Sequence, residues 1–148
     1  MKVEIFVLGK TKNPAVQRQA WARWLIVCEQ TNGAIEKRDG VVLINNATTK
    51  RAVLTALLDA LKRFNKAAVI RIYISDDFVR NALINCWLGR WKANNWHKIR
   101  LNGEIKHLDL WRQISEQMSK HAVSFAQGEE LDNNKNFKEL EWRIKNGR

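Results

Sequence analysis

Hydrophobic and polar positions alternate along the first third of the chain, a pattern typical of strands with one face buried. The pattern predicts three strands, at residues 2–8, 20–29 and 34–45. Residues 9–19 are mostly polar and predict a loop. Asn32-Gly33 indicates a tight hairpin turn between the second and third strands, because this pair readily adopts positive φ angles. Asp39-Gly40 indicates a bulge or a second turn inside the third strand.

Beyond the third strand the apolar residues recur every three to four positions, as in helices that bury one face. This spacing predicts helices at residues 51–64, 77–88 and 108–119, and a last one capped by Asp132 or Asn133 and ended by Gly147. Further strands are expected at 69–74 and 122–126. Thr48 or Thr49 can cap the first helix. The order β-β-β-α-β-α-α-β-α predicts an α/β fold, a mixed five-stranded sheet with helices on its faces, in a single domain over 1–148.

The net charge, the cysteines and the apolar runs indicate the kind of partner and the compartment of the protein. A net charge of +11 favours a polyanionic partner such as nucleic acid. Cys28 and Cys86 lie in apolar runs and outside any metal-type spacing, so we expect buried free thiols rather than a disulfide. The apolar run at the start is too short for a secretion signal, and no segment approaches the ~18 apolar residues of a membrane span. We therefore expect a cytoplasmic protein without a membrane partner.

Tryptophans recur in two places. Trp21 and Trp24 fall on opposite faces of the second strand, so we expect one in the core and the other exposed or covered by a partner. The segment 87–107 mixes tryptophans with lysine and arginine. This combination is typical of nucleic-acid binding, in which the cations contact phosphates and the aromatic rings lie between them. Trp87 and Trp91 are four residues apart on one helical face, which favours a core role first and base stacking second.

Several short motifs stand in a characteristic order. Residues 48–54 read TTKRAVL, 75–79 read SDDFV, 108–111 read LDLW after the tryptophan-rich segment, and 138–140 read KEL. These motifs and the order of elements resemble type 1 ribonuclease H, which cuts the RNA strand of an RNA/DNA hybrid. The family patterns are a T-x-N-R-x-E-L helix start, a T-D-S-x-x-V strand end, a basic handle and a D-x-L helix. The resemblance spans nearly the whole chain and implies the ribonuclease H-like fold, with the handle at about 87–107.

The resemblance also implies a site in which four carboxylates bind two Mg²⁺ ions at the scissile phosphate. Only Asp76 stands at one of these positions. Leu8, Val53 and Lys138 replace the other three ligands, and 128–130 (GEE) replaces the family's histidine. A single carboxylate cannot hold a metal pair, so we expect no intact catalytic set and no cofactor. One hypothesis is that the Lys138 ammonium replaces part of the metal charge and pairs with Asp76 or a bound phosphate.

Substrate-binding positions of the family are partly retained. Asn13 matches a position near the minor groove, and Thr48 and Arg51 match positions that hold or support a phosphate of the DNA strand. Lys50 replaces an asparagine that reads the hybrid. The expected nucleic-acid-binding residues are Asn13, Thr48, Lys50, Arg51, Arg90, Trp91, Lys92, Trp96, His97, Lys98, Arg100 and Lys106.

Three functions fit these features. The first is a catalytically inactive ribonuclease H-like protein that binds nucleic acid, either an RNA/DNA hybrid or duplex RNA. The second is an active hybrid-cutting endoribonuclease with a Mg²⁺ site rebuilt around Asp76, Asp77 and Glu129 or Glu130. Asp77 is also suited to capping its helix or to stabilising the positive end of that helix. The third is a protein-interaction module whose partner occupies the pocket left by the missing ligands, now partly apolar.

Overall fold

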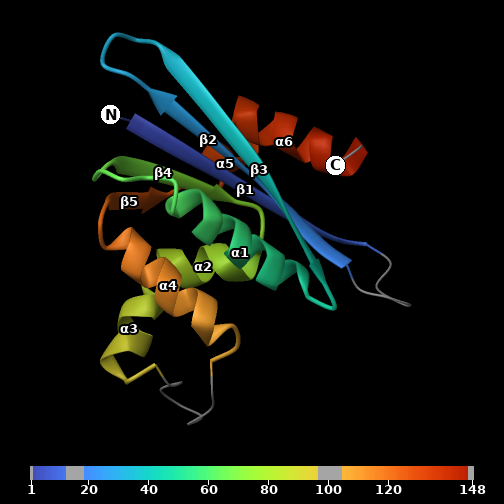
Figure 1. Cartoon of the computed structure of the whole chain (residues 1–148), viewed down its shortest axis with the longest axis vertical. Coiled ribbons are helices and arrows are strands. Elements are labelled where there is room, and N and C mark those ends of the chain that lie inside the picture. The colour runs from blue at the N-terminus through green and yellow to red at the C-terminus, as the bar shows by residue number, and fades with distance from the viewer. Residues whose placement is uncertain (1, 13–18, 97–104, 147–148) are drawn as a thin grey trace.

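The computed structural model describes residues 2–12, 19–96 and 105–146, and its centre is a five-stranded sheet (Figure 1). The spatial order is β3-β2-β1-β4-β5. β1 pairs antiparallel with β2, and β2 with β3, whereas β4 runs parallel to both β1 and β5. The predicted mixed sheet is confirmed. The strands are β1 Lys2–Lys12, β2 Gln19–Glu29, β3 Ile35–Asn45, β4 Val69–Ile74 and β5 Ala122–Phe125.

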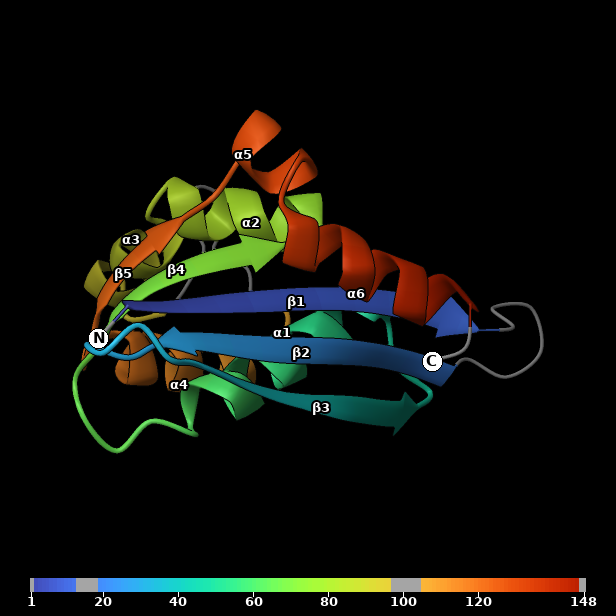
Figure 2. The same cartoon turned by 90° about the horizontal axis from the view of Figure 1, so that it is seen from above.

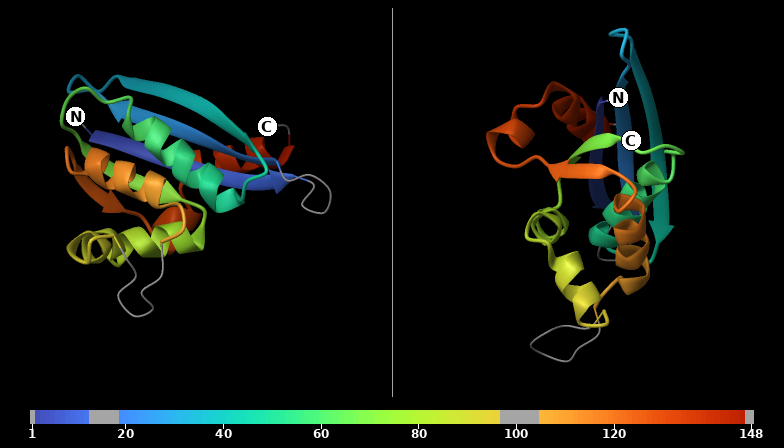
Figure 3. Two further views of the ribbon diagram at one scale, coloured as in Figure 1. Left: turned by 60° about the horizontal axis from the view of Figure 1, so that its bottom comes forward. Right: turned by 90° about the vertical axis from the view of Figure 1, so that its left-hand side faces the viewer.

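Helices cover both faces of the sheet. α1 lies on one face, and α6 crosses β1 on the opposite face (Figures 2 and 3). α2, α3 and α4 contribute to the same hydrophobic cluster as α1, so they share its side. The helices are α1 Thr49–Leu61, α2 Asp77–Ile84, α3 Trp87–Ala93, α4 Leu108–Met118, α5 Glu129–Asp132 and α6 Lys135–Asn146.

The hairpin between β2 and β3 forms as predicted. Gly33 has a φ of +88°, and the backbone N–H of Ala34 donates to Oδ1 of Asn32 at 2.9 Å. The bulge or turn predicted at Asp39-Gly40 is wrong, because the β2–β3 register continues through both residues without interruption. Gly40 is needed there because an added Cβ would lie 2.4 Å from Cε2 of the Trp24 indole.

Alternation along the strands produces two hydrophobic cores. The odd-numbered apolar residues of β1 face the helices α1 to α4, whereas Phe6 and Leu8 face α6. Trp24 is 2% exposed in the first core, and its Nε1 donates to Oδ2 of Asp59 at 2.8 Å. Trp21 is half-buried against the second core. The prediction that these tryptophans take opposite faces is confirmed, with Trp24 in the core.

Two local predictions are wrong. The helix predicted at 77–88 breaks at Cys86, whose φ is +58°, so α2 and α3 are separate helices. The last helix is capped by Asn134, whose Oδ1 accepts from the backbone N–H of Phe137 at 3.1 Å, rather than by Asp132 or Asn133. Asp132 instead ends the short helix α5.

The two cysteines are free, but their burial differs from the prediction. Cys28 is half-buried and Cys86 is exposed, since Cys86 sits at the break between α2 and α3. Burial raises the pKa of the Cys28 thiol. Among the described residues, the helices are all too short or too polar to cross a membrane.

Candidate nucleic-acid interface

The carboxyl end of β4 lies beside the middle of β1, at the position where the sequence places the former metal site. Val7 is in register with Ile74, and the backbone N–H of Ser75 donates to the carbonyl oxygen of Val7 at 3.1 Å. Asp76 follows as the N-cap of α2, where its Oδ1 accepts from the backbone N–H of Val79 at 2.9 Å. The remaining acid of the predicted set therefore stabilises a helix terminus.

Buried apolar side chains occupy two of the other ligand positions. Leu8 is 4% exposed in the core beneath α6, and Val53 is 0% exposed in the core beneath α1. At Gly9, an added Cβ would lie 2.5 Å from Cγ2 of Val53, so strand and helix are in close contact. Because both side chains are buried, they cannot line a partner surface, and that part of the protein-interaction hypothesis is wrong.

Lys138 occupies an exposed position on α6. Among the described residues, no ion pair joins it to Asp76, so the pairing of these two side chains is not present. Its contact with a bound phosphate stays a prediction. A divalent cation pair does not fit a site with two apolar residues and an ammonium group at three of its four positions.

Of the acids suggested for a rebuilt site, Asp77 and Glu130 are engaged elsewhere. Asp77 lies in the first turn of α2, at the positive end of the helix, and pairs with Arg80. The capping role belongs to Asp76. Glu130 accepts from Nε of Arg71 at 2.7 Å, and this hydrogen bond lowers the pKa of the Glu130 carboxyl. Glu129 is exposed. Within the described part of the chain, no group of three or more His, Cys, Asp or Glu side chains is arranged to hold a metal.

The polar network around Glu130 also explains why it is fixed at some distance from Asp76. The Tyr73 hydroxyl donates to Oε2 of Glu4 at 2.8 Å and lies 3.4 Å from Oε2 of Glu130. Burial, followed by the hydrogen bond to Glu4, raises the pKa of Tyr73. Arg71 is in register with Glu4 near the start of β1, whereas Leu8 lies four residues further along that strand. The network thus holds Glu130 toward the opposite end of the strand.

The start of α1 carries polar groups suited to a phosphate. Thr48 is its N-cap, and Oγ1 accepts from the backbone N–H of Arg51 at 3.2 Å. The Lys50 ammonium lies 5.5 Å from the centroid of the Phe78 ring. Phe78 is 45% exposed and was missed as a surface residue by the sequence reasoning. Its position one residue before Val79, which starts the buried stripe of α2, was the signal that could have found it.

Arg51 is a supporting residue. Its Nη2 donates to Oδ2 of Asp109 at 2.7 Å, and its Nη1 donates to Oδ1 at 3.2 Å. This bidentate pairing lowers the pKa of Asp109. Nη1 also lies 3.2 Å from Nδ1 of His107, which must accept because a guanidinium only donates. Burial, then the Arg51 charge, lowers the pKa of His107. The guanidinium joins α1 to α4 rather than pointing freely into solvent.

The handle is built on an aromatic row. Trp87 and Trp91 lie 6.0 Å apart between ring centroids, and Trp91 lies 5.5 Å from Trp111, which is 1% exposed. The predicted packing role of these tryptophans is confirmed. The Arg112 guanidinium lies 5.6 Å from the centroid of the Trp96 ring.

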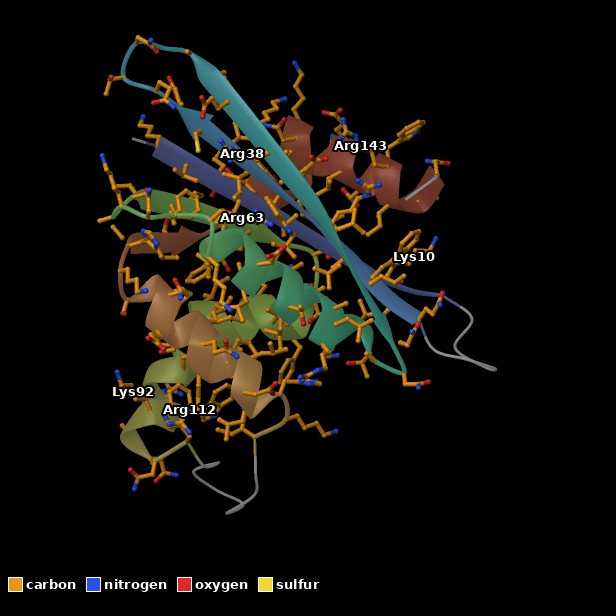
Figure 4. The ribbon with its side chains drawn as sticks, in the orientation of Figure 1. Lys10, Arg38, Arg63, Lys92, Arg112 and Arg143 are labelled. Carbon is orange, nitrogen blue, oxygen red and sulfur yellow. The ribbon has the colours of Figure 1, made fainter. Side chains whose placement is uncertain are left out.

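Around this row the cations are open to solvent. Lys92 of α3 and Arg112 of α4 lie at the same end of the molecule, away from Arg143 on α6 (Figure 4). Among the described residues, the exposed cations at the start of α1, in α3 and in or just before α4 include Lys50, Arg90, Lys92, Lys106 and Arg112. Four predicted contact residues lie outside the described residues: Asn13, His97, Lys98 and Arg100.

This sheet, with its flanking helices and basic handle, defines a ribonuclease H-like protein. The sequence profile of the RNase H family matches residues 10–128, and the chain belongs to that family. It is 32% identical over 80 residues to the Ribonuclease H of Caldicellulosiruptor saccharolyticus, which covers 54% of this chain and 54% of that protein. The chain thus matches about half the length of such curated relatives.

Solved structures support the same fold. The PFV RNase H domain superposes with a TM-score of 0.71 at 16% identity, covering 97% of this chain and 90% of that one. The foamy viral protease-reverse transcriptase in complex with an RNA/DNA hybrid gives a TM-score of 0.73 at 15% identity, covering 95% of this chain and 18% of that one. At this identity the likeness concerns the fold.

Proposed function

We propose that this protein is a catalytically inactive member of the RNase H family that binds nucleic acid without cutting it. The observation that carries the proposal is the burial of Leu8 and Val53 in two separate hydrophobic cores, at positions where the family's resemblance implies metal-binding carboxylates. Asp76 caps α2 and Lys138 adds a positive charge. Two adjacent dications need most of their anionic ligands, and this arrangement offers one.

An RNA/DNA hybrid or duplex RNA is the proposed ligand, held mainly through its phosphates. The net charge of +11 and the exposed cations of the handle support a polyanion. Phe78, next to the Lys50 ammonium, adds an exposed aromatic surface near the start of α1. The foamy viral protease-reverse transcriptase, which shares the fold, has been solved with an RNA/DNA hybrid. Binding without cleavage would shield such a duplex or recruit it to a larger assembly.

The remaining parts of the proposal concern the context of the protein. We place it in the cytoplasm as a single domain over residues 1–148, and its two free cysteines support a reducing compartment. Asn13, His97, Lys98 and Arg100 stay predicted phosphate or groove contacts.

A cleavage assay on a labelled RNA/DNA hybrid tests the central claim. Wild-type protein and Asp76→Ala are incubated with Mg²⁺ and, separately, with Mn²⁺, and the products are resolved on a denaturing gel. We expect no cleavage by either protein and retarded migration of the intact hybrid in a native gel. Cleavage by the wild type that disappears in Asp76→Ala would show a working metal site and refute the proposal. Cleavage of equal strength in both would indicate a contaminating nuclease.

A further inference from the structure

The solvent side of α6 carries a stripe of which the proposed function involves only Lys138. Phe137, Leu140 and Ile144 bury one face of this helix against the sheet. Residues spaced three, four and three apart lie on a common helical face, and here that face points away from the sheet. The α6 stripe consists of Lys135, Lys138, Trp142 and Lys145.

Trp142 is the central residue of the α6 stripe. It is 66% exposed, and among the described residues no aromatic ring or cation packs on its indole. A tryptophan in this state leaves a large apolar face in water, which is an unfavourable arrangement for the isolated protein. The exposed part of the indole is available to a planar partner.

The positive charge of the stripe is not neutralised by its neighbours. Oε1 of Glu139 accepts from Nη2 of Arg143 at 3.0 Å, and Nη1 of Arg143 lies 3.8 Å from Oδ2 of Asp39. Within the described part of the chain, no ion pair engages Lys138 or Lys145. These two lysines are seven positions apart, about 10 Å along the helix axis, with the indole between them.

From this arrangement we infer that the α6 stripe binds single-stranded nucleic acid, with an unpaired base stacked on Trp142 and phosphates on Lys138 and Lys145. Exposed aromatic rings flanked by cations are the elements of single-strand binding. An unpaired base is required because both faces of a base inside a duplex are already stacked. A membrane surface fits less well, because the apolar face of α6 is buried in the protein and the stripe offers one apolar side chain.

The inference rests on the proposed function and extends it. The stripe lies on the sheet face opposite α1, so it is separate from the basic handle and its aromatic row (Figure 3). A duplex held at the handle and a single-stranded tail held at α6 would make the preferred ligand a junction between paired and unpaired nucleic acid. The two surfaces can therefore be tested separately.

Fluorescence anisotropy can compare three labelled probes: a blunt RNA/DNA hybrid, the same hybrid with a single-stranded DNA tail at either end, and a thymidine oligonucleotide. Trp142→Ala should weaken binding of the tailed hybrid and the oligonucleotide by about 5- to 100-fold, while the blunt hybrid is unaffected. Trp142→Phe should retain most of the affinity because it keeps a stacking face. Val69→Ala is the matched control, since Val69 is 60% exposed at a different part of the surface.

The lysines provide a second readout. Lys138→Gln and Lys145→Gln should each reduce the salt dependence of oligonucleotide binding, by about 0.7 in the slope of log K against log salt for each lost phosphate contact. Equal affinities of wild type and Trp142→Ala for every probe would overturn the inference while leaving the proposed function standing. Loss of wild-type binding to all three probes would overturn both. A Trp142-dependent affinity for anionic vesicles, without any effect on nucleic acid, would assign the stripe to membranes instead.

Discussion

The contact between Gly9 and Val53 allows a direct test of how the former metal site is packed. In Gly9→Ala the new methyl group would lie 2.5 Å from Cγ2 of Val53 and 3.0 Å from Cγ2 of Thr49. Both separations are below normal van der Waals contact. Val53 is 0% exposed, so it cannot move aside without disturbing the core beneath α1.

The expected energies follow from this geometry. Gly9→Ala should lower the free energy of unfolding by about 1–3 kcal/mol, the usual cost of overpacking. Val53→Ala removes two buried carbon atoms at ~0.8 kcal/mol each, and the cavity raises the total to about 2 kcal/mol. Because Val53→Ala also deletes the atom that the new methyl would meet, the double variant should be about 1 kcal/mol more stable than the sum of the single changes predicts.

Urea unfolding monitored by far-ultraviolet circular dichroism measures the free energy of unfolding of the wild type, of both single variants and of the double variant. These four proteins form a double-mutant cycle. Gly89→Ala is the control, because a Cβ added at Gly89 meets nothing within 4 Å and Gly89 lies inside α3. That change should stabilise the protein by about 0.4–1 kcal/mol. Strict additivity in the Gly9 and Val53 cycle, or a Gly9→Ala variant as stable as Gly89→Ala, would refute the close packing of β1 against α1.

Three further predictions concern the cap, pH and salt. Asp76→Ala should cost about 1 kcal/mol in urea unfolding through loss of the α2 cap, and Asp76→Asn should restore most of it, since asparagine also caps. Lowering the pH from 7.5 to 5.5 should reduce the free energy of unfolding, because burial and the Arg51 charge lower the pKa of His107 in the folded protein. As the pH falls, the unfolded chain therefore binds a proton at His107 before the folded protein does. A His107→Asn variant whose stability keeps the full dependence on pH would contradict this. Hybrid affinity should fall steeply with salt, by about 0.9 in log K per phosphate contact and per tenfold salt, and a salt-independent affinity would argue against phosphate binding.

The sheet could be predicted from the sequence because burial on alternate faces leaves a two-residue period that a helix does not produce. The extent of β1 could not. The structure extends this strand beyond the predicted end at residue 8 to Lys12, which pairs with Gln19 of β2. Backbone pairing with a neighbouring strand holds these polar residues in a strand, and the identities of their side chains carry no signal of it.

Local breaks and surface placements were the main failures of the sequence reasoning. The helical spacing of apolar residues from 77 to 88 does not signal the left-handed conformation of Cys86, because cysteine rarely adopts this conformation. The loss of ligand residues at Leu8 and Val53 could be inferred from the resemblance. The sequence could not show that the two side chains are buried on opposite faces of the sheet. Because of this arrangement, the partly apolar pocket expected between them does not form.

The division of Leu8 and Val53 between two cores also bears on whether this protein could regain catalysis by mutation. A carboxylate introduced at either position alone would be buried without a metal to balance it, at a cost of several kcal/mol. A typical domain has only about 5–15 kcal/mol of stability in total. Metal binding would offset that cost only when several ligands are present together. Reversion would therefore have to pass through unstable single variants, so the present packing acts as a barrier against return to an active enzyme.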